Sequence, residues 1–161
     1  QRLEVELMKI YVDGDACPVI GVIEKIAKKK GVTVVIVCDE MHDIYSDYCQ
    51  VVKVPCGYDA VDMKIAVDVH KNDIVVTQDY GVAAMVLAKG ASVITRSGFQ
   101  LTNSNIDLLL FERHVAKIER KKTRGCIRRN KGSMEPKVSF YDRLSGMIDK
   151  EYEKEAVCYG G

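Results

Sequence analysis

The chain lacks any apolar run long enough to cross a membrane. Its first residues also lack the basic region, apolar stretch and small-residue cleavage site of a secretory signal peptide. None of the six cysteines forms a Cys-x-x-Cys pair and no histidine lies at zinc-finger spacing, which argues against a structural zinc site. Most of these cysteines lie in or beside apolar segments, as buried thiols do in a reducing compartment. We therefore expect a cytoplasmic protein without disulfides.

The chain has 161 residues, enough to bury a sizeable core without disulfides or metal. It contains no internal repeat and no linker long enough to divide it into two domains. We expect one α/β domain over residues 8–125 and a basic, partly helical or flexible extension over residues 126–161. Residues 1–7 precede Met8 and are interpreted as added or upstream residues.

Charge is distributed unevenly along the chain, although the net charge is only +1. Residues 1–112 contain 11 Lys or Arg against 16 Asp or Glu, whereas residues 113–137 contain 10 against 2. An acidic body with a basic arm allows two interpretations, a solvated tail or a contact with nucleic acid.

Apolar runs and helical patterns alternate along the chain. Strands are predicted at 9–12, 32–38, 51–54, 74–77 and 91–95, and helices at 18–30, 58–70, 82–89, 104–122 and 141–155. Such alternation predicts a three-layer α/β domain with a central, mostly parallel sheet and helices on its faces.

Two of the predicted strands end in acidic residues. Asp13 and Asp15 follow the first strand, with Gly14 between them to allow a sharp turn, and Asp79 follows the fourth. Ligands of parallel α/β proteins bind beyond the carboxyl ends of the strands, where these side chains would meet. Aspartate at a strand end is also an ordinary helix cap, so the pattern alone leaves both interpretations open.

Further polar side chains could join this group. Asp59 and Asp62 lie on one face of the second predicted helix, and Thr77 precedes Asp79 at the strand end. A buried carboxylate cluster without a basic partner favours a divalent cation, and oxygen ligands suit Mg²⁺ or Mn²⁺ rather than zinc. A shared site of Asp13, Asp15, Asp62 and Asp79 is therefore predicted, with Asp59 and Thr77 as secondary candidates.

Other reactive groups receive simpler interpretations. Asp39, Glu40 and Asp43 follow a strand and could extend the acidic group, but they are interpreted as a polar loop that ends the strand. His42 is interpreted as a structural or solvated residue. Cys17 is interpreted as a packed, inert thiol, because no basic group adjoins it in the sequence.

The basic arm carries the side chains that would contact a phosphate backbone. The candidates are Arg120, Lys121, Lys122, Arg124, Arg128 and Arg129. No aromatic residue interleaves them before Phe140, so base stacking is not indicated.

Several motifs resemble, in order, those of the bacterial YaiI/YqxD family. They are Met8–Val19, Ser46-Asp47-Tyr48, Gly57–Asp62, Asp73–Ala84, Asn105-Ile106-Asp107 and Glu112-Arg113-His114. The resemblance runs from Met8 to about Gly125. Residues 132–138 depart from the Gly-Pro and Arg-Thr motif that members often carry.

The resemblance implies a PIN-like fold, because the family is grouped with PIN-like domains, whose characterised members are mostly metal-dependent ribonucleases. It implies that Asp13 matches the first-strand acid of that superfamily and Asp79 the later strand-end acid. Asp15, Asp59 and Asp62 are further candidate counterparts.

The leading hypothesis is a phosphodiesterase, dependent on Mg²⁺ or Mn²⁺, that acts on RNA through Asp13, Asp79 and Asp15. One alternative is a non-catalytic module that binds RNA or a protein partner. Another is a phosphatase of the haloacid-dehalogenase type with Asp13 as nucleophile. Against this last hypothesis, Cys17 stands where that signature usually has Thr or Val.

Overall fold

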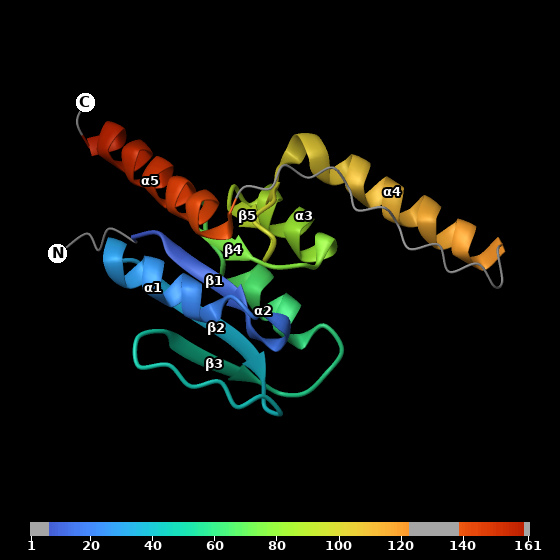
Figure 1. Cartoon of the computed structure of the whole chain (residues 1–161), viewed down its shortest axis with the longest axis horizontal. Helices are drawn as coiled ribbons and strands as arrows, with labels where there is room; N and C mark the ends of the chain where they lie inside the picture. The colour runs from blue at the N-terminus through green and yellow to red at the C-terminus, as the bar shows by residue number, and fades with distance from the viewer. Residues whose placement is uncertain (1–6, 123–138, 160–161) are drawn as a thin grey trace.

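The computed structural model describes residues 7–122 and 139–159 (Figure 1). The strands are β1 (Lys9–Asp13), β2 (Thr33–Asp39), β3 (Gln50–Val54), β4 (Ile74–Val76), β5 (Ser92–Ile94) and β6 (Gln100–Leu101). The helices are α1 (Ile20–Lys30), α2 (Ala60–Asp68), α3 (Tyr80–Ala88), α4 (Asn103–Lys122) and α5 (Phe140–Tyr159), with a short 3₁₀ helix, η1 (Gly14–Ala16), after β1.

The six strands form one sheet in the order β3-β2-β1-β4-β5-β6. Neighbours from β3 to β5 pair in parallel, and β6 pairs antiparallel with β5. The predicted mostly parallel α/β sheet is therefore confirmed. The prediction that residues 91–95 form the last strand is wrong, because β6 follows a tight turn. With only two residues, β6 is too short to show any periodicity in the sequence.

Helices cover both faces of the sheet and make three layers (Figure 1). One core joins the sheet to α1 and α5, and its fully buried side chains include Ile10, Val12, Ile23, Ile26, Leu144 and Ile148. The second core joins the sheet to α2, α3 and the start of α4, through Tyr11, Ile65, Val75, Val86, Val93 and Ile106. The described end of the predicted extension is thus a helix that completes the first core. None of the described helices is long and apolar enough to span a membrane.

Successive side chains of β1 point to opposite faces of the sheet. Ile10 and Val12 are buried in the first core, and Tyr11 is buried in the second. Asp13, two residues after Tyr11, therefore belongs to the face that α2 covers. The alternation of side chains along β1 therefore directs Asp13 towards α2.

Gly14 occupies a close approach between the chain after β1 and the neighbouring strand. A Cβ at this position would lie 2.8 Å from Cγ2 of Ile36 and 2.8 Å from Cδ1 of Ile44. The glycines with a positive φ are elsewhere in the described chain, at Gly31, Gly90 and Gly98. The sequence predicted a glycine at this turn for its backbone freedom, and that reason is wrong. Glycine is required at position 14 because the side chains of Ile36 and Ile44 leave no room for a Cβ.

We predict that Gly14→Ala destabilises the protein by about 1–3 kcal/mol, because an extra methyl group overpacks a buried site. Urea denaturation measures this change. The matched control is Gly21→Ala on α1, where a Cβ meets nothing within 4 Å. The control should be neutral or stabilising, by up to about 1 kcal/mol. Equal stability of the Gly14 variant and the wild type would contradict the packing account.

Candidate functional site

Asp13 lies at the carboxyl end of β1, between β2 and β4. Its Oδ1 accepts a hydrogen bond from the backbone N–H of Asp15 at 3.3 Å, which caps η1. Burial raises the pKa of Asp13, that hydrogen bond lowers it, and the charges of Asp15 and Asp79 raise it further. The three acids predicted to be catalytic therefore interact electrostatically.

An acidic hollow opens on the α2 side of Asp13. Its lining residues are Asp13, Asp15, Asp39, Gly57, Asp59, Ala60, Val61 and Asp62. They come from the ends of β1 and β2 and from the start of α2. Residues far apart in the sequence thus supply five carboxylates to one concavity.

Asp62 has the most perturbed acidity in this hollow. Burial, followed by the charges of Asp79, Asp13 and Asp59, raises its pKa from 3.8 to about 6. Asp59 precedes α2 with a φ of 60°, a left-handed conformation uncommon for residues other than glycine. A side-chain hydrogen bond between Asp59 and Asp62 favours the protonated form of Asp62. The structure therefore brings both predicted acids of this helix to the hollow.

Asp79 caps the N-terminus of α3, which is one of the two interpretations that the sequence left open for it. Its Oδ1 accepts hydrogen bonds from the N–H groups of Gly81 at 2.7 Å and Val82 at 3.1 Å. Thr77 is buried, and its Oγ1 accepts a hydrogen bond from the N–H of Asp79 at 3.1 Å. These bonds fix the position of the Asp79 carboxylate, whose charge reaches both Asp13 and Asp62.

A second group of possible ligands involves Asp15, Asp39 and His42, each of which offers one ligand atom within 4.8 Å of the others. Oδ1 of Asp15 accepts the backbone N–H of Asp39 at 3.1 Å, and Nδ1 of His42 lies 2.7 Å from Oδ1 of Asp39. The bond to His42 lowers the pKa of Asp39, and the same pair raises the pKa of His42. Sequence reasoning assigned Asp39 to a polar loop and interpreted His42 as a structural or solvated residue. The available signal was the position of Asp39 at the end of a strand.

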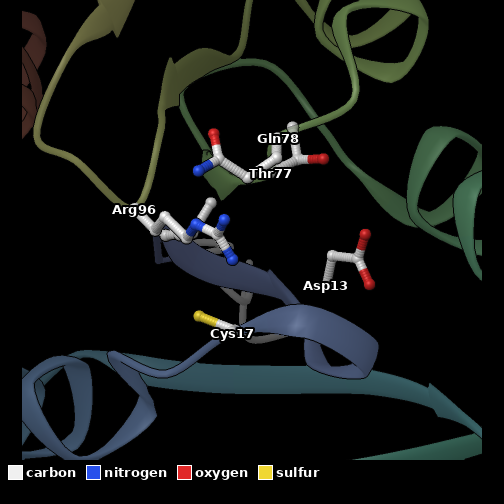
Figure 2. Close-up of a pocket in the computed structure, with 6 residues that line it drawn as sticks. Asp13, Cys17, Thr77, Gln78 and Arg96 are labelled. Carbon is white, nitrogen blue, oxygen red and sulfur yellow. The ribbon is translucent and has the colours of Figure 1, made fainter. Parts of the chain in front are cut away.

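A smaller hollow lies on the other side of Asp13 (Figure 2). Its lining residues are Asp13, Cys17, Val76, Thr77, Gln78 and Arg96. Burial raises the pKa of the Cys17 thiol, which disfavours the reactive thiolate. Sequence reasoning missed Arg96, although it follows the end of β5, a third strand that ends at this edge of the sheet.

Of the predicted nucleic-acid contacts, Arg120, Lys121 and Lys122 form the last turn of α4 and are exposed. Arg124, Arg128 and Arg129 lie outside the described residues. In Figure 1, α4 extends from the body of the protein, with its C-terminal half projecting beyond the sheet. The described basic side chains are therefore carried on a helix rather than on a loop.

Asp62 predicts a specific pH dependence in metal-free protein. A carboxyl whose folded-state pKa is raised contributes stability below its unfolded pKa of 3.8, and loses that contribution as the pH rises through about 6. We predict that Asp62→Asn raises the Tm at pH 8 and that this gain disappears near pH 4. Thermal unfolding in EDTA at both values measures the difference, and a gain independent of pH would contradict it.

Comparisons with known proteins identify the family of this chain and several of its relatives. The profile of the "Uncharacterized BCR, YaiI/YqxD family" matches residues 11–150. A UPF0178 protein of Clostridium perfringens is 46% identical over 146 residues, covering 89% of this chain and 96% of that protein. A UPF0178 protein of Lachnoclostridium phytofermentans is 51% identical over 114 residues, covering 71% of this chain and 76% of that protein.

Among solved structures, a mutant of Rae1 (YacP) from Bacillus subtilis covers 94% of this chain and 99% of its own. Its identity is 14% and its TM-score 0.43, a likeness too weak to carry an argument about this protein. The family profile matches most of the chain, because it extends from β1 into α5 and includes all the predicted acids. The chain therefore belongs to the YaiI/YqxD family, as its motifs implied.

Proposed function

We propose that the protein is a divalent-metal-dependent phosphodiesterase of the ribonuclease type, with Asp13, Asp79 and Asp15 as its catalytic carboxylates. The observation that carries this proposal is the position of Asp13, which lines both the acidic hollow and the hollow with Arg96. A cation held on one side of Asp13 would adjoin an anion held on the other. Such an arrangement would serve metal-assisted hydrolysis of a phosphodiester.

The donor set fits Mg²⁺ or Mn²⁺. The acidic hollow offers carboxylate oxygens, the ligands that these hard cations prefer. Burial and, after it, the negative charges of Asp79, Asp13 and Asp59 raise the pKa of Asp62 to about 6, so the ionised carboxylate is disfavoured in the protein alone. A divalent cation would relieve this repulsion. Asp13, Asp15, Asp62 and Asp79 are the proposed ligands, and Asp59 and Thr77 support them.

A bound cation would supply a more acidic water and stabilise charge on a phosphate. The protein's own groups hold the parts in place. The two N–H bonds to Asp79 and the Asp39 N–H bond to Asp15 fix both carboxylates before any substrate arrives.

One face of α4 offers a path for the RNA backbone. Arg113, Lys117, Arg120 and Lys121 line a surface hollow along the helix, and their spacing places them on one side of it. The guanidinium of Arg113 lies 4.0 Å from the ring centroid of Tyr80, the residue that follows Asp79. The basic stripe therefore starts beside the carboxylates and runs outward. Contacts of this kind would offset the acidic body and bind phosphates without reading sequence.

A non-catalytic module that binds RNA or a protein partner is the second candidate. It is favoured by the capping bonds of Asp13 and Asp79, which give both residues a structural role. Such a module would bind RNA in EDTA and keep that affinity in Asp13→Asn. The phosphatase hypothesis would instead need an aspartyl-phosphate on Asp13.

We predict that wild-type protein, stripped of metal, binds Mn²⁺ and that Asp13→Asn/Asp79→Asn abolishes the binding, because two of the proposed ligands lose their charge. Isothermal titration calorimetry measures the affinity, and circular dichroism verifies the fold. RNA cleavage by either single variant should fall by about 100-fold or more, since loss of a group that only hydrogen-bonds to a metal ligand typically costs about 10–100-fold.

The control for this experiment is Asp107→Asn/Asp149→Asn, which removes two exposed carboxylates from α4 and α5. It should bind Mn²⁺ like the wild type. Full Mn²⁺ affinity in the Asp13/Asp79 variant would contradict the proposed site.

A further prediction concerns the basic stripe. Replacing Lys117, Arg120 and Lys121 by Ala should weaken the binding of single-stranded RNA and flatten its salt dependence. Each lost phosphate contact reduces the slope of log K against log salt by about 0.7. Fluorescence anisotropy in EDTA, at several salt concentrations, measures this slope without turnover.

The matched control replaces Lys25, Lys29 and Lys150, which are exposed on α1 and α5. It removes the same charge from helices on the opposite face of the sheet. Equal slopes for both triple variants would mean that net charge, rather than the α4 stripe, determines RNA binding.

A further inference from the structure

The hollow on the second side of Asp13 has the composition of an anion site next to a cation site. It is a small hollow that is partly open to solvent. Arg96 is the one positively charged side chain among its six lining residues. Figure 2 shows Arg96 between Cys17 on one side and Thr77 and Gln78 on the other, with Asp13 across from it.

The backbone that carries Arg96 is held firmly by a tight turn between β5 and β6. Thr95 is buried, and its N–H donates to the carbonyl of Phe99 at 2.9 Å. The N–H of Gly98 donates to the carbonyl of Thr95 at 2.9 Å, and Oγ1 of Thr95 accepts the N–H of Phe99 at 3.2 Å. Arg96 is therefore presented from an ordered position, as a binding residue should be.

The turn also fixes Arg96 relative to the strand ends. Ile94 pairs with Val76, which pairs with Val12, so the ends of β5, β4 and β1 lie side by side. Asp13 is the last residue of β1, and Arg96 lies two residues beyond the end of β5. The positive charge of Arg96 extends into the hollow, where it lowers the pKa of Cys17 against the larger effect of burial.

We propose that this hollow binds a phosphate group of the substrate, with the guanidinium of Arg96 as its principal donor. A guanidinium presents paired N–H groups that match two phosphate oxygens. The carboxamide of Gln78 supplies further N–H donors. The hydroxyl of Thr77 accepts the N–H of Asp79 through oxygen, and its own proton is available for donation.

This subsite rests on the proposed function, because Asp13 would repel a phosphate unless a cation neutralised it. The two ligands should therefore bind cooperatively, and each should raise the affinity of the other by the same factor. Arg96 is then a substrate-positioning residue, and the substrate class is a phosphate ester whose phosphate lies between Arg96 and the cation.

The test is calorimetric titration of inorganic phosphate into the full chain, with saturating Mg²⁺ and again in EDTA. Wild type should bind phosphate at least about 10-fold more tightly with Mg²⁺. Arg96→Ala should weaken that binding by about 10-fold or more, as loss of charge-assisted hydrogen bonds does. Arg96→Lys should recover part of the affinity, because it keeps the charge but not the paired donors.

Lys53→Ala is the matched control, because Lys53 is an exposed cation on β3, at the same edge of the sheet. Its phosphate affinity should equal that of the wild type. Unchanged phosphate affinity in folded Arg96→Ala, or no phosphate binding by wild type with Mg²⁺, would overturn the subsite. Mg²⁺ alone, titrated separately, should bind wild type and Arg96→Ala equally well. If Mg²⁺ alone does not bind wild-type protein, the result would contradict the proposed function instead.

Discussion

The site depends on the position of β1 in the middle of a parallel sheet. Its side chains alternate between two buried cores, so a shift of register by one residue would move Ile10 and Val12 out of the first core and turn Asp13 to the other face of the sheet. With that register fixed, β1 ends beside β2 on one side and β4 on the other. Asp13 therefore stands at the point where the strand order reverses, the usual ligand position in open α/β sheets.

The fold could be predicted in outline because its signals are local and strong. The β-branched run of β2 and the acids that follow β1 and β4 can be recognised in the sequence alone. The roles of Arg96 and His42 could not be predicted, because they depend on contacts between segments that are distant in the sequence. Arg96 matters because β5 lies beside β4, and His42 because its loop returns to Asp15. Gly14 was recognised, but only the adjoining side chains reveal why no larger residue fits.

Charge is distributed unevenly over the structure, with carboxylates at one edge of the sheet and cations along α4. Carboxylates gather where three strands and α2 meet, and burial, followed by the charges of neighbouring carboxylates, raises the pKa values of Asp13 and Asp62. A folded chain tolerates such a cluster because capping bonds and the rigid sheet hold it. The opposite charge is concentrated along α4, where the guanidinium of Arg113 lies over the ring of Tyr80.

The most direct test of the central claim is a crystal structure of the protein with Mn²⁺, measured at a wavelength where manganese scatters anomalously. The account predicts an anomalous peak in the acidic hollow, within coordination distance of Asp13 and of at least one of Asp62 and Asp79. A peak confined to Asp15, Asp39 and His42, or no peak at this edge of the sheet, would contradict it.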